Sequence, residues 1–291
     1  MRYPVDNAVI MAAGTSSRFA PLSYERPKAL IEVRGEVLIE RQIRQLRQAG
    51  IGEIAVVTGY KAEQFAYLKD KLGVQLIHNP DYLTRNNNSS IRAARSLIRN
   101  TYVCSSDNYF TANPFEPVVE DAYYAAVYAR GETKEWCMTE DDRGYIDSVT
   151  VGGRDAWYML GHTFWSEPFS RRFLDILDRI YDLPGTAGLL WESIFMAHLD
   201  ELKMRIRRYG ADEIFEFDTL DELRAFDSSY IADTRSPILR EVAQRLGVPE
   251  AEITDVCAFK AADTQAAGFR FDAGGRRYQY TYTSHSLQEV L

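Results

Sequence analysis

The sequence predicts an α/β fold in which helices flank a mixed, mainly parallel, Rossmann-like sheet, with a small C-terminal appendage. Three observations support this prediction. Short apolar runs alternate with amphipathic segments over the first third of the chain. The segments between these runs are long enough for crossover helices, which join parallel strands in right-handed βαβ units. After Asp107 the connections become short, which is typical of antiparallel strands.

Four parallel strands and three helices are expected in this first third. The run Asn7–Ala12 (NAVIMA) is almost wholly apolar, as expected for a strand that is buried on both faces. In the first helix Ile39, Ile43 and Leu46 recur at helical spacing, and Gly50 ends it. The same patterns predict strands over Glu53–Thr58, Val74–His78 and Thr101–Ser105, and helices over Val37–Ala49, Ala62–Leu72 and Ser90–Ile98.

The rest of the chain is expected to extend the sheet and then to form the appendage. Before Ser228, strands are predicted over Tyr123–Tyr128, Tyr145–Val151, Trp157–Trp165, Met204–Arg208 and Ile214–Phe217, and helices over Phe169–Tyr181 and Trp191–His198. Beyond it, a helix at Ile238–Leu246 and strands at Ile253–Lys260, Gly268–Asp272 and Arg277–Tyr282 are predicted. We therefore expect one domain over residues 1–228 and a small extension over residues 229–291.

Composition excludes several classes of protein. The chain has 291 residues, and its 34 Lys and Arg against 42 Asp and Glu give a net charge of −8. Nucleic-acid binding needs clustered cations that this acidic chain lacks, so no nucleic-acid partner is expected. Cys104, Cys137 and Cys257 lack a C-x-x-C spacing, which argues against a disulfide scaffold or a zinc ribbon. Without a secretory signal or a long apolar run, we expect a cytoplasmic protein with no membrane partner.

The segment Met11–Leu30 (MAAGTSSRFAPLSYERPKAL) is the most informative part of the chain. It follows a buried strand, and its Gly14 allows the backbone to approach a ligand closely, with N–H groups that cradle phosphate. Arg18 and Lys28 add positive charge where a triphosphate would lie. Neither G-x-x-x-x-G-K-[ST] nor G-x-G-x-x-G occurs, so a P-loop NTPase and a dinucleotide-binding enzyme are not supported.

The pattern A-A-G-x-x-S-R-F-x-P-L-S…P-K-A-L resembles the signature loop of the sugar-nucleotide-type nucleotidyltransferases, and within them the CTP:phosphocholine cytidylyltransferase branch. The resemblance runs from about residue 7 to about residue 226. This sequence departs from the superfamily at Ser16, where many members carry glycine. Further similarity lies in Val57-Thr58-Gly59-Tyr60, Asn86-Asn87-x-x-Ser90, Ser106-Asp107-Asn108-Tyr109, Glu135-Trp136 and Glu216-x-Asp218.

The resemblance implies a nucleotide-diphospho-sugar-transferase-like fold with a nucleotide across the carboxyl ends of the parallel strands. Arg18 and Lys28 would hold the phosphates. Asn87 and Ser90 would offer polar groups to the base, although Asn and Ser are also favoured helix caps. Base binding and helix capping explain Ser90 equally well, whereas base binding is favoured for Asn87. The full set expected to bind nucleotide is Ala12, Ala13, Gly14, Thr15, Gly59, Tyr60, Asn87 and Ser90.

The implied reaction is in-line attack by an acceptor phosphate oxygen on the α-phosphorus of CTP. That oxygen is already anionic, so positioning and charge stabilisation suffice. Mg²⁺ is the implied cofactor, with Asp107 and Asp218 as ligands at the ends of two strands and Glu216 in reserve. The residues expected to be catalytic are Lys28, Arg18, Asp107 and Arg154.

The acceptor is expected to be an amino-alkyl phosphate or phosphonate. Aromatic faces bind a quaternary ammonium through cation–π attraction, often with a carboxylate nearby. The candidate acceptor residues are Tyr109, Glu135, Trp136, Trp191 and Glu192. The expected function is transfer of CMP to phosphocholine, which gives CDP-choline and pyrophosphate. The chain is also compatible with a homodimer.

Three alternatives stay open from the sequence. The first is the same reaction on 2-aminoethylphosphonate, whose primary amine would favour carboxylates over an aromatic cage. The second is a sugar-1-phosphate nucleotidyltransferase, and the third a catalytically inactive nucleotide sensor. The segment Ile253–Tyr282 also resembles the opening hairpin of choline-kinase-like proteins, as a remnant of a kinase N-lobe without kinase activity.

Overall fold

The computed structural model describes residues 2–260 and 266–290, which group into two compact units. The first, which we call the sheet unit, contains the chain up to Gly14 together with Leu38–Glu216. The second, which we call the loop unit, contains Thr15–Val37 together with the chain from Phe217 onward. The grouping differs from a division at residue 228, because the segment after the first strand clusters with the C-terminal segment. The division into a domain over residues 1–228 and a small extension over residues 229–291 stays a prediction.

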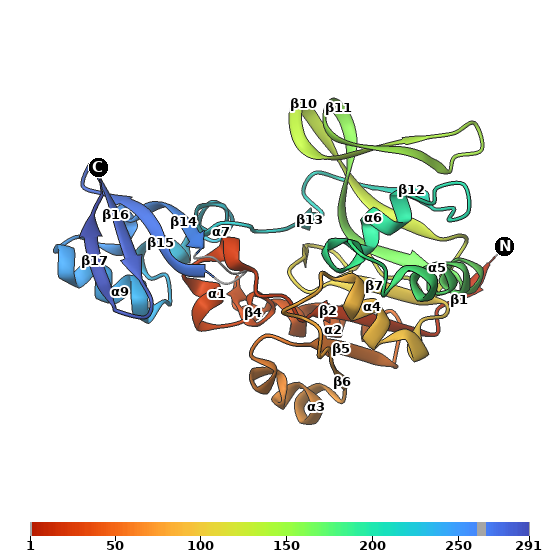
Figure 1. Ribbon diagram of the computed structural model, residues 1–291, viewed down its shortest axis with the longest axis horizontal. Coiled ribbons are helices and arrows are strands. Elements are labelled where there is room, and N and C mark those ends of the chain that lie inside the picture. The colour runs from red at the N-terminus through yellow and green to blue at the C-terminus, as the bar shows by residue number, and fades with distance from the viewer. Residues whose placement is uncertain (1, 261–265, 291) are drawn as a thin grey trace. The chain divides into compact units, whose positions relative to one another are not determined.

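The sheet unit is built on a seven-stranded sheet in the order β12-β10-β11-β7-β2-β5-β6 (Figure 1). β2 pairs in parallel with both β5 and β7, and β5 pairs in parallel with β6. The predicted α/β fold is therefore confirmed. The bounds of these strands are Asn7–Ala12 for β2, Ile54–Thr58 for β5, Gln75–His78 for β6 and Thr101–Ser105 for β7.

The other half of the sheet is a long antiparallel pair. β10 (Tyr123–Glu140) pairs with β11 (Ile146–Trp165), and β11 pairs with β7. The separate strands predicted at Tyr145–Val151 and Trp157–Trp165 are instead one strand, because shifts of register let the pairing continue past Gly152, whose φ is +79°. β12 (Arg205–Tyr209) closes this edge in parallel with β10.

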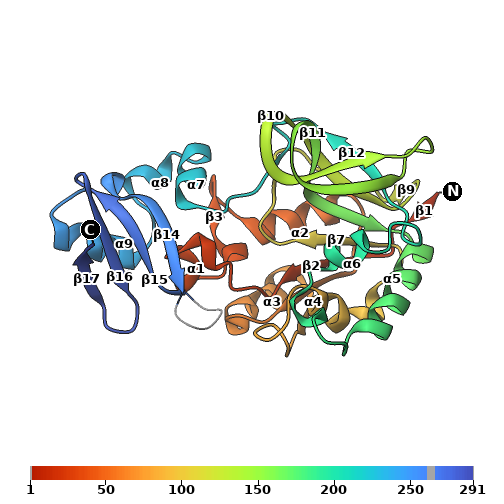
Figure 2. The ribbon, with the colours of Figure 1, turned by 45° about the horizontal axis from the view of Figure 1, so that its top comes forward.

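Helices cover both faces of this sheet (Figures 1 and 2). Those on one face contribute to a large apolar core around Trp165, Phe173 and Trp191. Among residues 2–260 and 266–290, no helix combines the length and apolar character that a membrane crossing needs. The helices are α2 (Leu38–Gln48) and α3 (Tyr67–Leu72), then α4 (Asn88–Ala93), α5 (Glu167–Ile180) and α6 (Trp191–Met196). Short pairs β1 (Tyr3–Pro4) with β9 (Val118–Val119), and β8 (Tyr109–Phe110) with β13 (Ile214–Phe215), complete the unit.

The loop unit joins the signature loop to the C-terminal segment. The loop contains η1 (Ser17–Phe19), α1 (Leu22–Glu25), η2 (Lys28–Leu30), β3 (Glu32–Val33) and β4 (Glu36–Val37). The C-terminal segment contains α7 (Leu220–Phe226), α8 (Ser229–Ala232), α9 (Pro237–Leu246) and an antiparallel sheet of β14 (Thr254–Lys260), β15 (Ala266–Ala273), β16 (Arg276–Thr281) and β17 (Ser286–Glu289) (Figure 2). The predicted strands over Gly268–Asp272 and Arg277–Tyr282 pair as a hairpin around Gly274-Gly275, whereas the sequence does not predict β17.

Arg224 of α7 is a buried cation that ties the parts of the C-terminal segment together. Its side chain is 8% exposed. The guanidinium donates hydrogen bonds to the carbonyl oxygens of Tyr230, Glu250 and Ile253. It also forms an ion pair with Asp221 at 3.4 Å. Removing the guanidinium would therefore leave several buried carbonyls without their donor.

We expect Arg224→Met to lower the free energy of unfolding by about 2–4 kcal/mol, since each orphaned buried acceptor costs about 1–3 kcal/mol. Urea unfolding measures the change. Arg276→Met is the matched control, because Arg276 of β16 pairs with an exposed Glu289, and exposed pairs contribute about 0–1 kcal/mol. Equal midpoints for the two variants would contradict the role assigned to Arg224.

Candidate active site

The ends of β2 and β5 meet at a close contact that requires glycine. The backbone N–H of Tyr60 donates to the carbonyl of Ala13 at 3.0 Å. A Cβ on Gly59 would lie 2.6 Å from the ring of Tyr82 and 2.9 Å from the Ala13 carbonyl oxygen. Such contacts are too short for any side chain, so packing explains Gly59. Ala12 and Ala13 are buried at the end of β2, beside this contact.

The polar residues around the start of α4 are tied into the sheet unit. The Nδ2 of Asn79 donates to the hydroxyls of Ser89, at 2.8 Å, and Ser90, at 3.2 Å. Asn87 donates through Nδ2 to Glu192 at 3.0 Å and accepts through Oδ1 from the Trp191 N–H at 2.7 Å. Both ends of the Asn87 amide therefore position the start of α6, and α4 begins at Asn88 rather than at the predicted Ser90.

Glu192 is the carboxylate that these contacts hold. Besides the bond from Asn87, its other oxygen accepts a hydrogen bond of 3.5 Å from the Tyr124 hydroxyl. Burial raises the pKa of Glu192 to about 7, although the bonds from Asn87 and Tyr124 favour the ionised form. Near neutral pH this carboxyl is therefore poised between its two states. A bound cation would shift it to the carboxylate.

The charges of two further carboxylates, Glu135 and Glu216, act on tyrosines of the sheet unit. Burial raises the pKa of Tyr124 well above its usual value, and the charges of Glu192 and Glu216 raise it further. The pKa of Tyr158 on β11 is raised in the same way by burial and by the charges of Glu135 and Glu216. Among these carboxylates, Glu192 contacts Tyr124 directly, and the charges of Glu135 and Glu216 act on Tyr158. No local sequence pattern indicates either tyrosine.

The turn after β7 presents hard oxygen atoms. Asp107 lies in this turn. The Nδ2 of the neighbouring Asn108 donates to Glu216 at 3.4 Å, and its buried Oδ1 has no hydrogen-bond partner among the described residues. The pairing of β8 with β13 brings Glu216 to this turn, because Phe215 lies opposite Tyr109. Carboxylate and amide oxygens fit Mg²⁺, although the described residues form no cluster of three metal-binding side chains.

The loop unit presents two cations around one carboxylate. Arg18 lies 2.8 Å from Asp218, and Lys28 lies 3.5 Å from it. The Lys28 side chain is 3% exposed, whereas that of Arg18 is 77% exposed. A buried lysine needs a compensating negative charge, which Asp218 supplies in this structure. Asp218 is distant in sequence from Arg18 and Lys28, and the fold of the loop unit brings the three residues together.

The backbone of the signature loop is left-handed at Ser16, where φ is +47°. Glycine adopts this conformation freely, whereas another residue incurs a strain of about 1–2 kcal/mol. Ser16 therefore adopts, at a cost in strain, a backbone conformation that glycine adopts freely. A Cβ added at Gly14 would meet no described atom within 4 Å, so packing does not demand glycine there.

One expectation about local structure is wrong. Asp218 does not lie at the end of a strand, because β13 ends at Phe215 and Thr219 caps α7. Arg154 lies within β11. Its exposed guanidinium forms ion pairs with Glu132 at 3.3 Å and with Asp155 at 3.7 Å. Its role near the reacting phosphates stays a prediction.

The aromatic candidates fall into two groups. Trp191 is 1% exposed and stacks on Tyr124 with ring centroids 5.7 Å apart. Tyr109 is also buried, and the guanidinium of Arg41 lies 4.6 Å from its ring centroid. Neither ring offers an open face to an ammonium ion, so neither fits the predicted cage. Trp136, in contrast, is half-buried on β10.

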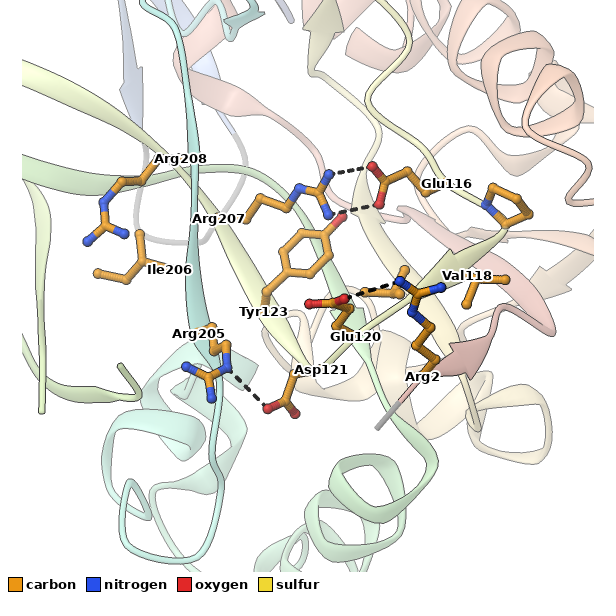
Figure 3. Close-up of a pocket in the computed structure, with 12 residues that line it drawn as sticks. Arg2, Glu116, Val118, Glu120, Asp121, Tyr123, Arg205, Ile206, Arg207 and Arg208 are labelled. Carbon is orange, nitrogen blue, oxygen red and sulfur yellow. Dashed lines mark hydrogen bonds and ion pairs between the residues drawn. The ribbon is translucent and has the colours of Figure 1, made fainter. Parts of the chain in front are cut away.

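A separate cavity of about 990 Å³ lies beside the edge strand β12 (Figure 3). Most of its arginines are paired with carboxylates that also line it, whereas Arg208 pairs with Glu140 outside the lining. Arg207 donates to both oxygens of Glu116 at 2.7 and 3.0 Å, and Arg205 pairs with Asp121 at 3.3 Å. The predicted site residues do not line this cavity. Each of these arginines already has a carboxylate partner, and we assign the cavity no ligand.

The sequence matches the family described as the MobA-like NTP transferase domain over residues 8–181. It is 37% identical over 234 residues to a 2-aminoethylphosphonate cytidylyltransferase from Lancefieldella rimae, covering 79% of this chain and 95% of that protein. It is 31% identical over 220 residues to a choline-phosphate cytidylyltransferase from Streptococcus pneumoniae, covering 76% and 96%.

Two solved structures share the fold of this chain. The CTP:phosphocholine cytidylyltransferase from Streptococcus pneumoniae superposes with a TM-score of 0.73 at 31% identity, over 77% of this chain and 98% of that one. A UDP-glucose pyrophosphorylase superposes with a TM-score of 0.59 at 13% identity, over 78% and 98%, and thus shares the fold alone. Roughly a fifth of this chain lies outside each of these alignments.

Proposed function

Because the chain belongs to the family of MobA-like NTP transferase domains and is a nucleotidyltransferase, we propose that it is a cytidylyltransferase that transfers CMP from CTP to 2-aminoethylphosphonate. The observation that carries this choice of acceptor is the carboxyl of the half-buried Glu192, held by Asn87 and Tyr124. The relative from Lancefieldella rimae supports the same choice, since its name gives that acceptor.

The charge and shape of the acceptor group favour a primary amine. A primary ammonium carries three N–H donors, which match carboxylate and hydroxyl oxygens. A quaternary ammonium has no such donor and is bound mainly by open aromatic faces. Glu192 accepts a hydrogen bond from the Tyr124 hydroxyl, and the charges of Glu135 and Glu216 act on Tyr158, whereas the ring of Trp191 is buried. The residues around Glu192 therefore suit a primary ammonium better than a quaternary one.

In the proposed reaction an anionic oxygen of the acceptor attacks the α-phosphorus of CTP. A new P–O bond forms, the bond from the α-phosphorus to the bridging oxygen breaks, and pyrophosphate leaves with the electron pair. The attacking oxygen is already deprotonated, so no residue has to remove a proton. Lys28 and Arg18 stabilise the charge on the phosphates.

The implied metal fits the side chains of this chain. Asp107 and Glu216 would hold Mg²⁺ together with the amide oxygen of Asn108, which is buried and has no partner among the described residues. Asp218 stays a predicted ligand as well. When bound, Mg²⁺ neutralises charge on the phosphates.

Pyrophosphate release with CTP tests the proposal directly. The acceptor panel is 2-aminoethylphosphonate, phosphoethanolamine, phosphocholine and a set of sugar 1-phosphates. We expect the highest kcat/KM with 2-aminoethylphosphonate. Turnover with sugar 1-phosphates alone, or with no acceptor in the panel, would overturn the proposal. Replacement of CTP by ATP, GTP or UTP is the control for the nucleotide and is expected to lower turnover.

Glu192→Gln is expected to raise the KM for 2-aminoethylphosphonate by about 10- to 100-fold, because a hydrogen bond to a charged group is worth about 1.5–3 kcal/mol. The KM for CTP should stay unchanged. In the wild type, the acceptor KM should also rise as the pH falls through about 7, since the carboxylate becomes protonated there. Steady-state kinetics between pH 6 and pH 8 measure both effects.

The titration of the phosphonate itself is the same for both enzymes, so the ratio of the variant's KM to the wild-type KM isolates Glu192. This ratio should shrink toward low pH. A ratio of one at every pH would contradict an acceptor role for Glu192. Glu167→Gln serves as the matched control, because Glu167 begins α5 on the surface, where it pairs with Arg171.

Phosphocholine is the second candidate acceptor. The relative and the structure from Streptococcus pneumoniae favour it, and Trp136 still offers a half-buried ring. If this acceptor is correct, Trp136→Ala should raise the KM for phosphocholine about tenfold, and the KM for CTP by much less, as expected for loss of a cation–π contact. A normal KM for phosphocholine in this variant would exclude Trp136 as an ammonium-binding residue.

A further inference from the structure

The segment that carries Lys28 and Arg18 is held by the C-terminal segment, and not only by its own hydrogen bonds. The ring of Tyr24 in α1 stacks on that of Tyr282, with centroids 3.7 Å apart and planes inclined by 6°. β14 also contacts η1, the turn that contains Arg18. Residues that are more than two hundred positions apart in sequence therefore build one surface of the loop unit.

Glu25, the residue after Tyr24, anchors the start of α9. Its Oε1 accepts hydrogen bonds from the Ser236 hydroxyl at 3.0 Å and from the Ile238 N–H at 2.8 Å. The carboxylate thus satisfies a free N–H group in the first turn of a ten-residue helix and lies at the positive end of its dipole. Ser236 is fully buried, so this contact is shielded from water.

A second set of contacts lies on the other side of Lys28. The carbonyl oxygen of Glu32 accepts hydrogen bonds from the Tyr230 hydroxyl at 2.6 Å and from Arg235 at 3.2 Å. The N–H of Arg34 donates to Asp227 at 2.7 Å. Lys28 is therefore bracketed by two anchors, one at residues 24–25 and one at residues 32–34.

We propose that the C-terminal segment, from Phe217 onward, is a positioning element for the residues that grip the nucleotide. The inference rests on the proposed function, in which Lys28 and Arg18 contact the phosphates of CTP. A loop of this length loses much conformational entropy when it is ordered, and the two anchors order it before the nucleotide arrives. Tyr282 and Glu25 are positioning residues, and neither needs to touch the substrate.

Four full-length variants test this inference. Tyr282→Ala removes the stacking on Tyr24, and Glu25→Ala removes the anchor of α9. Tyr282→Phe keeps the stacking ring and should rescue the loss. Tyr278→Ala is the matched control, because it also removes a tyrosine ring from the C-terminal segment. That ring stacks on Phe271 and not on the signature loop. Circular dichroism first confirms that each variant is folded at the temperature used.

Calorimetric titration with CTP and Mg²⁺, without acceptor, gives the first readout. Tyr282→Ala and Glu25→Ala should each weaken CTP binding about 10- to 100-fold, the size of effect that a small misplacement of a binding group produces. The KM for CTP should rise by the same factor, while the KM for the acceptor stays within twofold. Tyr282→Phe and Tyr278→Ala should bind CTP like the wild type.

The binding of CTP by the wild type distinguishes failure of the proposed function from failure of the positioning role alone. A wild-type chain that does not bind CTP would overturn both the proposed function and this inference. A wild type that binds CTP, with unchanged affinity in Tyr282→Ala and Glu25→Ala, would overturn the positioning role alone. Equal losses for CTP and for the acceptor, or the same loss in Tyr278→Ala, would show a general effect on stability and would also overturn it.

Discussion

Lys28→Met lowers kcat/KM for CTP by about 10²- to 10³-fold in this account, the usual effect of removing one group that stabilises transition-state charge. The Lys28 ammonium is buried and lies 3.5 Å from Asp218. Methionine is unbranched and of similar length, so the variant removes the charge and leaves the packing nearly unchanged. Initial rates of pyrophosphate release at low CTP measure the loss.

The control for this prediction is Lys69→Met, which removes an exposed lysine from α3. That variant should keep the wild-type kcat/KM. If Lys28→Met is folded and retains kcat/KM within threefold of the wild type, then Lys28 does not hold the phosphates, and the interpretation of the signature loop is wrong.

Asp107→Ala is expected to remove nearly all turnover, with kcat reduced by about 10³-fold or more. Asp107 lies in the turn that follows β7, next to Asn108, whose amide reaches Glu216. Loss of this carboxylate would weaken the hold on Mg²⁺ and leave charge on the phosphates uncompensated. The measurement is kcat as a function of Mg²⁺ concentration.

Asp107→Asn should retain more activity than Asp107→Ala, because an amide oxygen is a weaker but usable ligand. Asp142→Ala, an exposed residue at the tip of the β10–β11 hairpin, is the control. If Asp107→Ala keeps the wild-type kcat at every Mg²⁺ concentration, then Asp107 does not hold the metal.

The parallel half of the sheet could be predicted because its strands are specified locally. Asn7–Ala12 and Thr101–Ser105 have the predicted bounds, since each is an apolar run that ends at a polar turn. The start of α7 could also have been found. Thr219 and Glu222 form a capping box, and this pattern would have ended the preceding strand before Asp218.

Other features depend on packing between distant parts of the chain, so no local pattern reveals them. A glutamate beside Trp191 suggested a ligand-binding ring, yet Trp191 is buried against Tyr124 and Trp165. The stacking of Tyr24 on Tyr282 likewise joins two segments that look independent in the sequence. In both cases tertiary contacts decide whether a side chain faces a ligand or the interior.

A crystal structure of the chain with Mg²⁺ and a non-hydrolysable CTP analogue is the most direct test of how the triphosphate is gripped. We predict that the Lys28 Nζ lies about 3 Å from a phosphate oxygen and that Asp107 coordinates the metal on the same triphosphate. A nucleotide bound elsewhere, with Lys28 and Asp107 both remote from its phosphates, would contradict the account.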